Sequence, residues 1–285
     1  MLTTPEITPA TPTIAPALSE QETITHVLKE LEDLKNIVLI ENNTGDWSIT
    51  HPMLFGFILT TVAKLSVPLA CRMPDHFFID FKGIQSEQAS AHIMTNGTTQ
   101  LHVGSELIRK SLTEEDNLSL RSLQWTLAHE LSHLCDPKFK LSAKLYLVRD
   151  FLNKFGLYFA TFSLAQMVFQ NTGHQAFFAA CGFIILNKIF TIALHRNYEY
   201  TADKLSLQAM PDITLSEIEN TLTSMQQAVK PLCLTEPTNA INMLIGGCFP
   251  SLKSKKLYKK IVLLSFFSLH PSISKRLEYL KKLNG

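Results

Sequence analysis

Three absences narrow the classes to which this 285-residue chain can belong. Its 26 basic and 25 acidic residues nearly cancel, so it lacks the positive charge of a nucleic-acid-binding protein. Its five cysteines are widely spaced and include no Cys-x-x-Cys pair, which argues against a disulfide framework and a cysteine zinc site and favours a reducing compartment. Neither a glycine-rich phosphate loop nor a serine or cysteine triad signature is evident. We therefore expect no nucleic-acid partner.

The first 22 residues lack the features of a secretory signal, because no basic region precedes a compact apolar run. Thr, Pro and Ala dominate this segment, so it has too little apolar bulk to offset the entropy of ordering. The composition therefore predicts a disordered tail at 1–22.

Helices are expected in the next segment, 23–72. Apolar residues recur at helical spacing over 20–40, where Thr23 or Thr25 would cap the helix. The apolar stretch 52–71 is interrupted by a lysine and a proline. This interruption favours a buried helix, with a membrane span as the alternative.

The segment 73–154 is expected to hold a small β-sheet and a helix with a buried leucine stripe. Three runs rich in aromatic and branched residues, HFFIDF, AHIMT and TQLHV, occur between residues 76 and 103. Asn96-Gly97 separates the last two runs, and such a pair between alternating apolar residues is a strong hairpin signal. Leucines then recur at helical spacing up to Leu134.

Charge is absent from residues 155–187, which include no Asp, Glu, Lys or Arg. Two apolar blocks, 155–170 and 176–194, are separated by the polar turn NTGHQ. A membrane-spanning helix needs about 20 residues, so the second block is long enough and the first is marginal. We expect a membrane helical hairpin at 155–194, the alternative being a buried helical pair in a soluble core. Basic residues precede and follow the hairpin, which by the positive-inside rule puts both of its ends on the cytoplasmic side.

The sequence His129-Glu130-Leu131-Ser132-His133 lies within the leucine-striped helix. Two histidines four residues apart share one helix face, so both imidazoles can bind one Zn²⁺. Glu130 can then accept the proton of a metal-activated water. Such a motif arises by chance in roughly one chain in fifty of this composition. The alternative is a pair of surface histidines.

A catalytic zinc site needs one more protein ligand, which we expect downstream. The candidates are Glu199 and Asp203, four residues apart in HRNYEYTADKLSL, with His195 as an alternative. Taken alone, a Glu and an Asp at this spacing more often form a solvated helix face.

Three ordered motifs carry a family resemblance. HELSH, then EYTAD beginning 66 residues after His133, then HPSISKR near the C terminus, together resemble the HtpX and CAAX prenyl endopeptidase family of membrane zinc metallopeptidases, which are gluzincins. The resemblance implies one Zn²⁺ per chain held by His129, His133 and Glu199. It also implies that Asp203 orients a ligand histidine, a contact that fixes the imidazole tautomer.

The same resemblance implies catalytic roles for His270 and Arg276 beside the substrate carbonyl. Pro271 would be the first residue of a helix, leaving His270 at its start, where it can donate to the developing oxyanion. The alternative is a capping or core histidine.

The resemblance covers residues 75–283 and implies a mainly α (α+β) fold. This would be a zincin-like helical metallopeptidase core with a small β-sheet, a membrane hairpin between the ligand helices, and the third-ligand and C-terminal catalytic helices in 195–285. Family members align a polypeptide substrate as an extended strand against a segment equivalent to Ser90-Ala91-His92. The usual Asn-Ala-Phe element is altered here, although strand addition relies mainly on backbone hydrogen bonds.

We therefore expect a membrane-associated, integral zinc metalloendopeptidase whose site faces the cytoplasm. Membrane lipids are expected partners, and five lysines within 253–260 can contact anionic headgroups or form a solvated helix face. The competing hypotheses are a catalytically inactive membrane or partner-binding scaffold with this fold, and a soluble helical protein.

Overall fold

The computed structural model describes residues 19–41, 50–144, 146–170, 173–233 and 270–284. The chain divides into two compact units, Met1–Phe57 and Ile58–Gly285. Most of the predicted N-terminal tail and the lysine-rich segment 253–260 lie outside the described residues.

Helix α1 (Glu20–Glu41) of the first unit confirms the helix expected over 20–40, but its cap differs from the predicted one. Ser19 and Glu22 form a reciprocal cap, since the Ser19 N–H donates to Glu22 Oε2 at 2.8 Å and the Glu22 N–H donates to Ser19 Oγ at 3.3 Å. The predicted tail 1–22 is therefore too long by three residues, and the predicted caps Thr23 and Thr25 lie inside the helix. Helix α3 (Pro52–Ser66) confirms the second expected helix, which ends before Pro68.

Three strands form a mixed sheet: β1 (His76–Asp80), β2 (Ala89–Ile93) and β3 (Thr99–Gly104). The order is β1-β3-β2, with β1 parallel and β2 antiparallel to β3. The Asn-Gly hairpin prediction is confirmed, because Gly97 has φ +87° in the turn between β2 and β3. Strand β2 thus lies at one edge of the sheet.

Short helices connect the sheet to the helical core. The helix η1 (Gly83–Glu87) packs so tightly on β3 that a Cβ added at Gly104 would lie 2.2 Å from the Ser86 carbonyl oxygen. After the sheet follow α4 (Ser105–Thr113), η2 (Glu115–Asn117), α5 (Leu120–Cys135) and α6 (Pro137–Lys144), and later α9 (Leu215–Cys233) and α12 (Ile273–Asn284).

Helix α5 is the centre of the second unit. Ser119 caps it by accepting the Ser122 N–H. The predicted leucine stripe is buried as expected, with Leu123, Leu127 and Leu131 fully inaccessible. Helix α5 packs against β2 at the sheet edge and against α4, α8 and α9.

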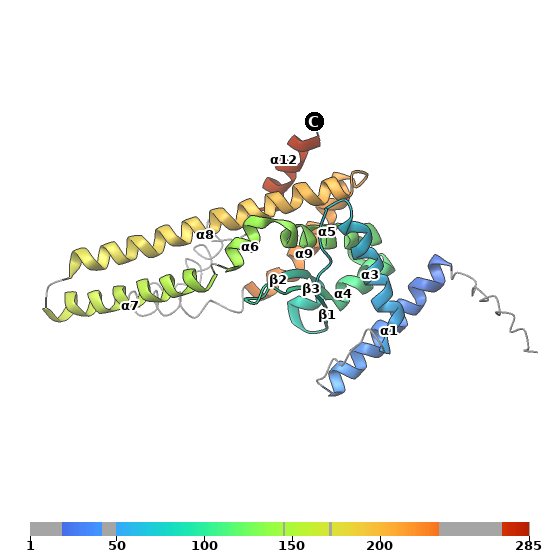
Figure 1. Cartoon of the computed structure of the whole chain (residues 1–285), viewed down its shortest axis with the longest axis horizontal. Coiled ribbons are helices and arrows are strands. Elements are labelled where there is room, and N and C mark those ends of the chain that lie inside the picture. Colours follow the sequence, from blue (N-terminus) through green and yellow to red (C-terminus); the bar gives the residue numbers. More distant parts are fainter. Residues whose placement is uncertain (1–18, 42–49, 145, 171–172, 234–269, 285) are drawn as a thin grey trace, which may run out of the picture. The chain divides into compact units, whose positions relative to one another are not determined.

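Helices α7 (Tyr146–Gln170) and α8 (His174–Ala209) form a long antiparallel hairpin (Figure 1). Gly173, at φ +83°, precedes the second helix. Helix α8 runs unbroken for 36 residues, so the expected membrane segment and the third-ligand segment are one helix. The sequence offers no Gly or Pro near Leu194 that would separate them.

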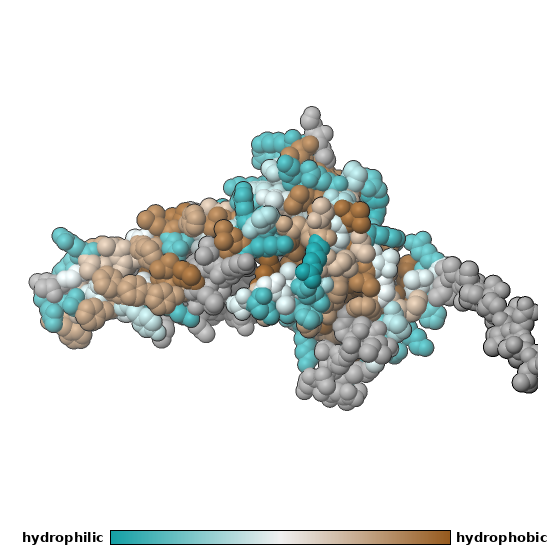
Figure 2. Space-filling view, in the orientation of Figure 1, coloured by the Kyte–Doolittle hydropathy of each residue, from teal (hydrophilic) through white to brown (hydrophobic). Residues whose placement is uncertain are grey.

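The distal part of this hairpin exposes large apolar side chains, and Figure 2 shows them as hydrophobic surface. Among the described residues, α8 is the one helix long and apolar enough to cross a membrane, judged by length and composition. Only 12% of its apolar window is buried. Such a helix is weak evidence for a membrane protein, but the low burial does not favour the expected alternative of a soluble-core pair.

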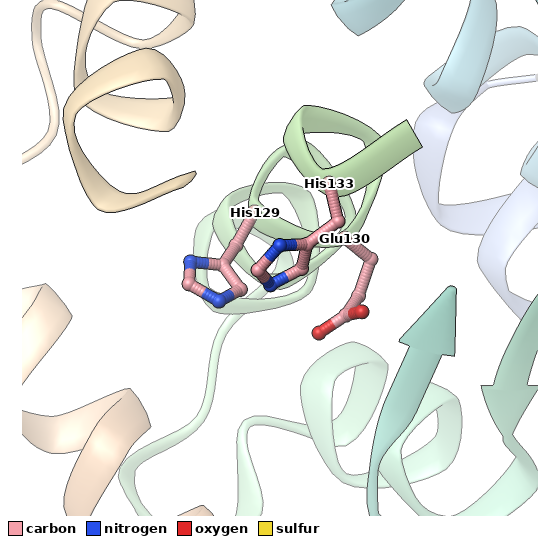
Figure 3. Close-up of side chains that lie close together, drawn as sticks. All are labelled: His129, Glu130 and His133. Atoms are coloured by element: carbon pink, nitrogen blue, oxygen red, sulfur yellow. The ribbon is translucent and has the colours of Figure 1, made fainter. Parts of the chain in front are cut away.

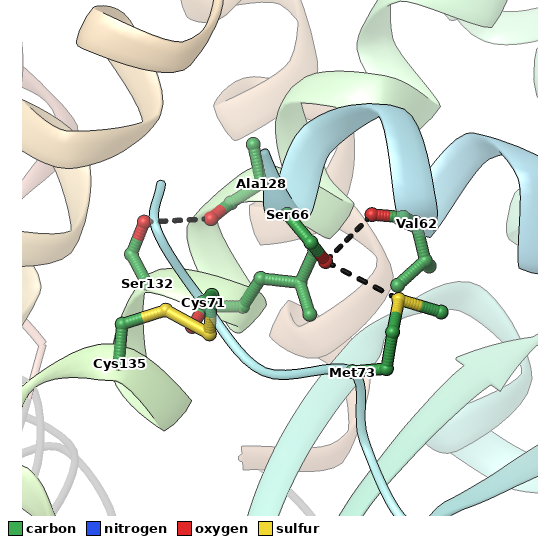
Figure 4. The surroundings of a disulfide bond; sticks show 8 residues. Val62, Ser66, Cys71, Met73, Ala128, Ser132 and Cys135 are labelled. Atoms are coloured by element: carbon green, nitrogen blue, oxygen red, sulfur yellow. Dashed lines mark hydrogen bonds between the residues drawn. A yellow bond between two sulfur atoms is a disulfide. The ribbon is translucent and has the colours of Figure 1, made fainter. Parts of the chain in front are cut away.

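A disulfide joins Cys71 to Cys135 (Figure 4). The argument from cysteine spacing against disulfides is wrong for this pair. The two residues are separated by 64 positions, but the fold brings their Cα atoms to 5.4 Å, well within bonding range. The bond ties the end of the motif helix α5, two residues after His133, to the segment that leads into β1.

Candidate metal centre

His129 and His133 lie one turn apart on the same face of α5 (Figure 3). Their rings are mutually perpendicular, with centroids 4.9 Å apart. Both are buried because neighbouring aromatic rings wall them in: Trp125 lies beside His129 and Phe139 beside His133. The motif helix thus presents two preoriented imidazoles from one rigid element.

Helix α8 brings Glu199 to the same point. Its Oε2 lies 3.5 Å from His129 Nε2 and its Oε1 lies 3.6 Å from His133 Nε2. The side chain is 9% exposed, so the solvated-face alternative for Glu199 is wrong. The predicted ligands from two helices therefore converge, with Glu199 rather than His195 facing the histidine pair.

The spacing of these atoms fits a zinc ion. Ligand atoms about 2.0–2.1 Å from a tetrahedral ion lie about 3.3 Å from each other, close to the separations seen here. The Nδ1 atom of buried His133 has no hydrogen-bond partner among the described residues. Two imidazole nitrogens and a carboxylate oxygen form the donor set of zinc peptidases, so these residues fit the metal that the sequence predicts.

Asp203 lies one turn beyond Glu199 on α8 and is fully buried. Its Oδ1 lies 3.0 Å from His129 Nδ1, leaving Nε2 of that ring directed at Glu199. With Nδ1 facing Asp203, Nε2 is the ring nitrogen that would be left for a metal ion. Asp203 therefore contacts one of the two predicted ligand histidines, and its role at the metal stays a prediction.

Arg276 of α12 closes the network from the other side. Its Nε donates to Asp203 Oδ2 at 2.8 Å, and its terminal nitrogens contact Asp203 Oδ1 and, at 3.4 Å, Glu199 Oε2. The guanidinium also lies over the Trp125 ring, 5.8 Å from the centroid. Arg276 is therefore buried against the carboxylates rather than open to a substrate.

Electrostatics make the site attractive to a cation. Burial by itself would raise the pKa of Glu199, but hydrogen bonds from the three surrounding histidines hold it well below its usual value. Burial likewise disfavours a charged His129, yet its bonds to Asp203 and Glu199 raise its pKa to about 9. A metal ion bound at this ring would therefore compete with a proton for His129.

Glu130 projects from α5 toward the sheet (Figure 3). Its Oε2 accepts the N–H of Ala91 in β2 at 2.9 Å. The residues that flank β2 turn their backbone groups inward, since the Gln88 carbonyl accepts the Gly104 N–H and the Met94 N–H donates to the Thr98 carbonyl. The alternation of a strand therefore points the Ala91 amide out of the free edge of the sheet, and Glu130 lies between this edge and the histidines.

His270 lies at the rim. It is exposed, and its Nδ1 lies 3.1 Å from Glu199 Oε1. Helix α12 begins at Ile273, with Ser272 accepting the Arg276 N–H, so the prediction that Pro271 is the first helical residue is wrong by two positions. All seven predicted site residues nevertheless lie in one neighbourhood.

Comparison with known proteins gives a family. Residues 62–284 match the model of peptidase family M48, which includes the HtpX and CAAX prenyl endopeptidases. The chain belongs to peptidase family M48. No curated protein and no solved structure gives a significant match. The matched region of this M48 chain contains all three motifs, and the mainly helical fold with its small sheet agrees with the predicted zincin-like class.

Several contacts of the M48 site could not be predicted from this amino-acid sequence alone. Trp125 lies one turn before His129, which suggests a shared face, but nothing indicates that Arg276 would stack on it. The Ala91 contact uses a backbone amide, so side-chain identity carries no information about it. The Arg276–Asp203 pair spans 73 residues.

Proposed function

We propose that this M48 chain is a zinc-dependent metalloendopeptidase that hydrolyses peptide bonds of polypeptides at or near a membrane. The observation that carries the proposal is the convergence of His129 and His133 Nε2 on the Glu199 carboxylate from a helix 66 residues away. Ligand atoms at these separations, buried beside the further carboxylate of Glu130, suit a hydrolytic metal site better than a structural one.

One zinc would be held by His129, His133 and Glu199, and when bound it supplies a Lewis acid that polarises the scissile carbonyl and acidifies water. Glu130 takes the proton of the attacking water and passes it to the leaving amine. The Ala91 amide orients the carboxylate for this transfer, because it bonds one of the two oxygens and leaves the other free.

The family resemblance implies that His270 and Arg276 both lie beside the substrate carbonyl, where the oxyanion develops. We assign this contact to His270, since its exposed imidazole can turn its second nitrogen outward while Nδ1 bonds Glu199. The buried guanidinium of Arg276 is bonded to Asp203, so we assign Arg276 to positioning Asp203 and, through it, His129.

The free edge of β2 supports binding of the substrate as an extended strand. The Ala91 N–H points out of this edge and bonds Glu130, so a strand that pairs with the other outward backbone groups of β2 would run past the site. This argument uses backbone geometry and therefore holds although the segment Ser90-Ala91-His92 lacks the usual Asn-Ala-Phe side chains.

We further propose that the α7–α8 hairpin inserts into a membrane and that the catalytic unit is cytoplasmic. The exposed aromatic residues of the hairpin support insertion, and the basic residues that flank it, such as Lys138 and Arg196, support the cytoplasmic side. Cysteine pairs are normally reduced there, so on this proposal Cys71 and Cys135 are thiols in growing cells and bond under oxidation.

Metal content and turnover test the catalytic proposal together. Purified wild-type protein should hold about one zinc per chain, and Glu199→Ala much less, because a site with two ligands binds weakly. Glu130→Gln should keep its zinc and lose peptide cleavage. Wild-type turnover by Glu130→Gln would refute the mechanism, and a wild-type protein without zinc under chelator-free conditions would favour the inactive scaffold.

A further inference from the structure

One face of the sheet carries rings that the catalytic proposal does not use. Strand alternation puts Ile79, Leu101 and Val103 in the core and places Phe78, Ser90, His92 and His102 on the opposite, outer face. Phe78 and His92 are exposed and His102 is partly buried.

These rings are stacked on one another across the strands. Phe78 lies parallel to His102 with centroids 4.7 Å apart, and His92 meets His102 edge-on at 5.0 Å. His102 also contacts Asp80 at 3.2 Å, and Ser90 Oγ lies 3.0 Å from His92 Nε2. The cluster, which we call the ring platform (Phe78, Ser90, His92 and His102), is therefore held in a defined arrangement.

The ring platform reaches the free edge beside the metal centre. Phe78, His102 and Ser90 form one cross-strand row, because Phe78 pairs with His102 and His102 pairs with Ser90. A strand added to β2 would extend this row by one side chain, about 5 Å away. Ala91, which bonds Glu130, lies between Ser90 and His92, so that side chain would belong to a residue within about two positions of the scissile bond.

We propose that the ring platform is a specificity subsite for an aromatic side chain of the substrate, bound next to Ser90 and His92. The inference rests on the proposed peptidase function and deepens it by naming a residue class that the enzyme selects. A substrate ring placed there would continue the stack of Phe78 and His102 in an offset or edge-on geometry.

Charge around the platform favours an aromatic over an acidic side chain. Partial burial and the neighbouring His102 lower the pKa of His92, so its imidazole is neutral at pH 7. The carboxylate of Asp80 is bonded to His102. The carboxylate of Glu130 lies close enough to His92 to raise its pKa slightly against these two effects. An acidic substrate residue would therefore meet two carboxylates and no fixed cation from these residues.

The test is cleavage-site profiling of the full-length protein in detergent with a peptide mixture derived from a proteome. Wild-type cleavage sites should be enriched in Phe, Tyr or Trp at one position near the scissile bond by between about two- and tenfold, the range that one aromatic contact supplies. His92→Ala and Phe78→Leu should lose most of the enrichment while keeping their zinc content and melting temperature. His174→Ala, an exposed histidine in the hairpin turn, is the matched control and should keep it.

A binding measurement separates failure of this subsite from failure of the proposed function. Fluorescence anisotropy of labelled peptides that differ by one Phe→Ala change is measured on the Glu130→Gln protein. Tighter binding of the Phe peptide that His92→Ala abolishes supports the subsite even if no cleavage is found. Aromatic enrichment that survives in both platform variants, wild-type cleavage without aromatic preference, or equal binding of both peptides would overturn it.

Discussion

The Asp203→Asn substitution tests whether the buried network positions the metal ligands. Asp203 is fully inaccessible and bonds both His129 Nδ1 and the Arg276 guanidinium. Burial would raise the pKa of this carboxyl, but Arg276 and His129 hold it below its ordinary value, so the group is charged at neutral pH. The amide keeps the shape and removes the charge.

Two magnitudes follow from this geometry. Removing one partner of a buried ion pair costs about 3–5 kcal/mol, because the nearest carboxylate left to the Arg276 charge would be that of Glu199 at 3.4 Å. Losing a carboxylate behind a ligand histidine typically lowers metal affinity about 10–100-fold. Denaturant unfolding of the metal-free protein and zinc competition with a chromogenic chelator measure the two effects separately.

A second variant and a control make the result specific. The double variant Asp203→Asn with Arg276→Met removes both charges and should be less destabilised than the sum of the single changes. Asp212→Asn breaks the exposed pair with Arg121 and should change stability little. If Asp203→Asn costs under about 1 kcal/mol and leaves zinc affinity unchanged, the network does not position the site.

Three further predictions concern the scaffold. Replacing Cys71 and Cys135 by serine should destabilise the oxidised protein by about 4 kcal/mol, which is the loop entropy for a separation of 64 residues. The same replacement should have no such effect under reducing conditions. Alkylation in growing cells should label both thiols if the catalytic unit is cytoplasmic, whereas full protection would place the unit in an oxidising compartment. Gly104→Ala should lower the unfolding free energy by about 1–3 kcal/mol, because the added Cβ would lie 2.2 Å from the Ser86 carbonyl oxygen. Gly56→Ala is the control, since a Cβ there meets nothing within 4 Å. Equal losses of stability in the two variants would contradict the packing argument. The protein should stay in the membrane pellet on carbonate extraction, and its complete release would show that the hairpin does not insert.

The sequence by itself determined the local elements and the chemistry of the site. The leucine stripe and motif spacing defined α5, the Asn-Gly pair defined the hairpin of β2 and β3, and the runs rich in aromatic and branched residues defined the strands. These features are local because they arise from helix and strand periodicity over a few residues. The candidate ligands followed from motif order and family resemblance.

Only the tertiary structure decided which distant residues meet. Cys71 approaches Cys135 across 64 positions, and Arg276 pairs with Asp203 across 73. Such pairs depend on how α5, α8 and α12 pack, and packing is set by the shapes of many side chains together rather than by any single pattern. The tertiary structure also showed that α8 is continuous, so that the apolar hairpin segment and the segment with Glu199 and Asp203 are one helix. The ring platform likewise needed the strand order β1-β3-β2, which places β3 between two strands and leaves β2 at an edge beside Glu130.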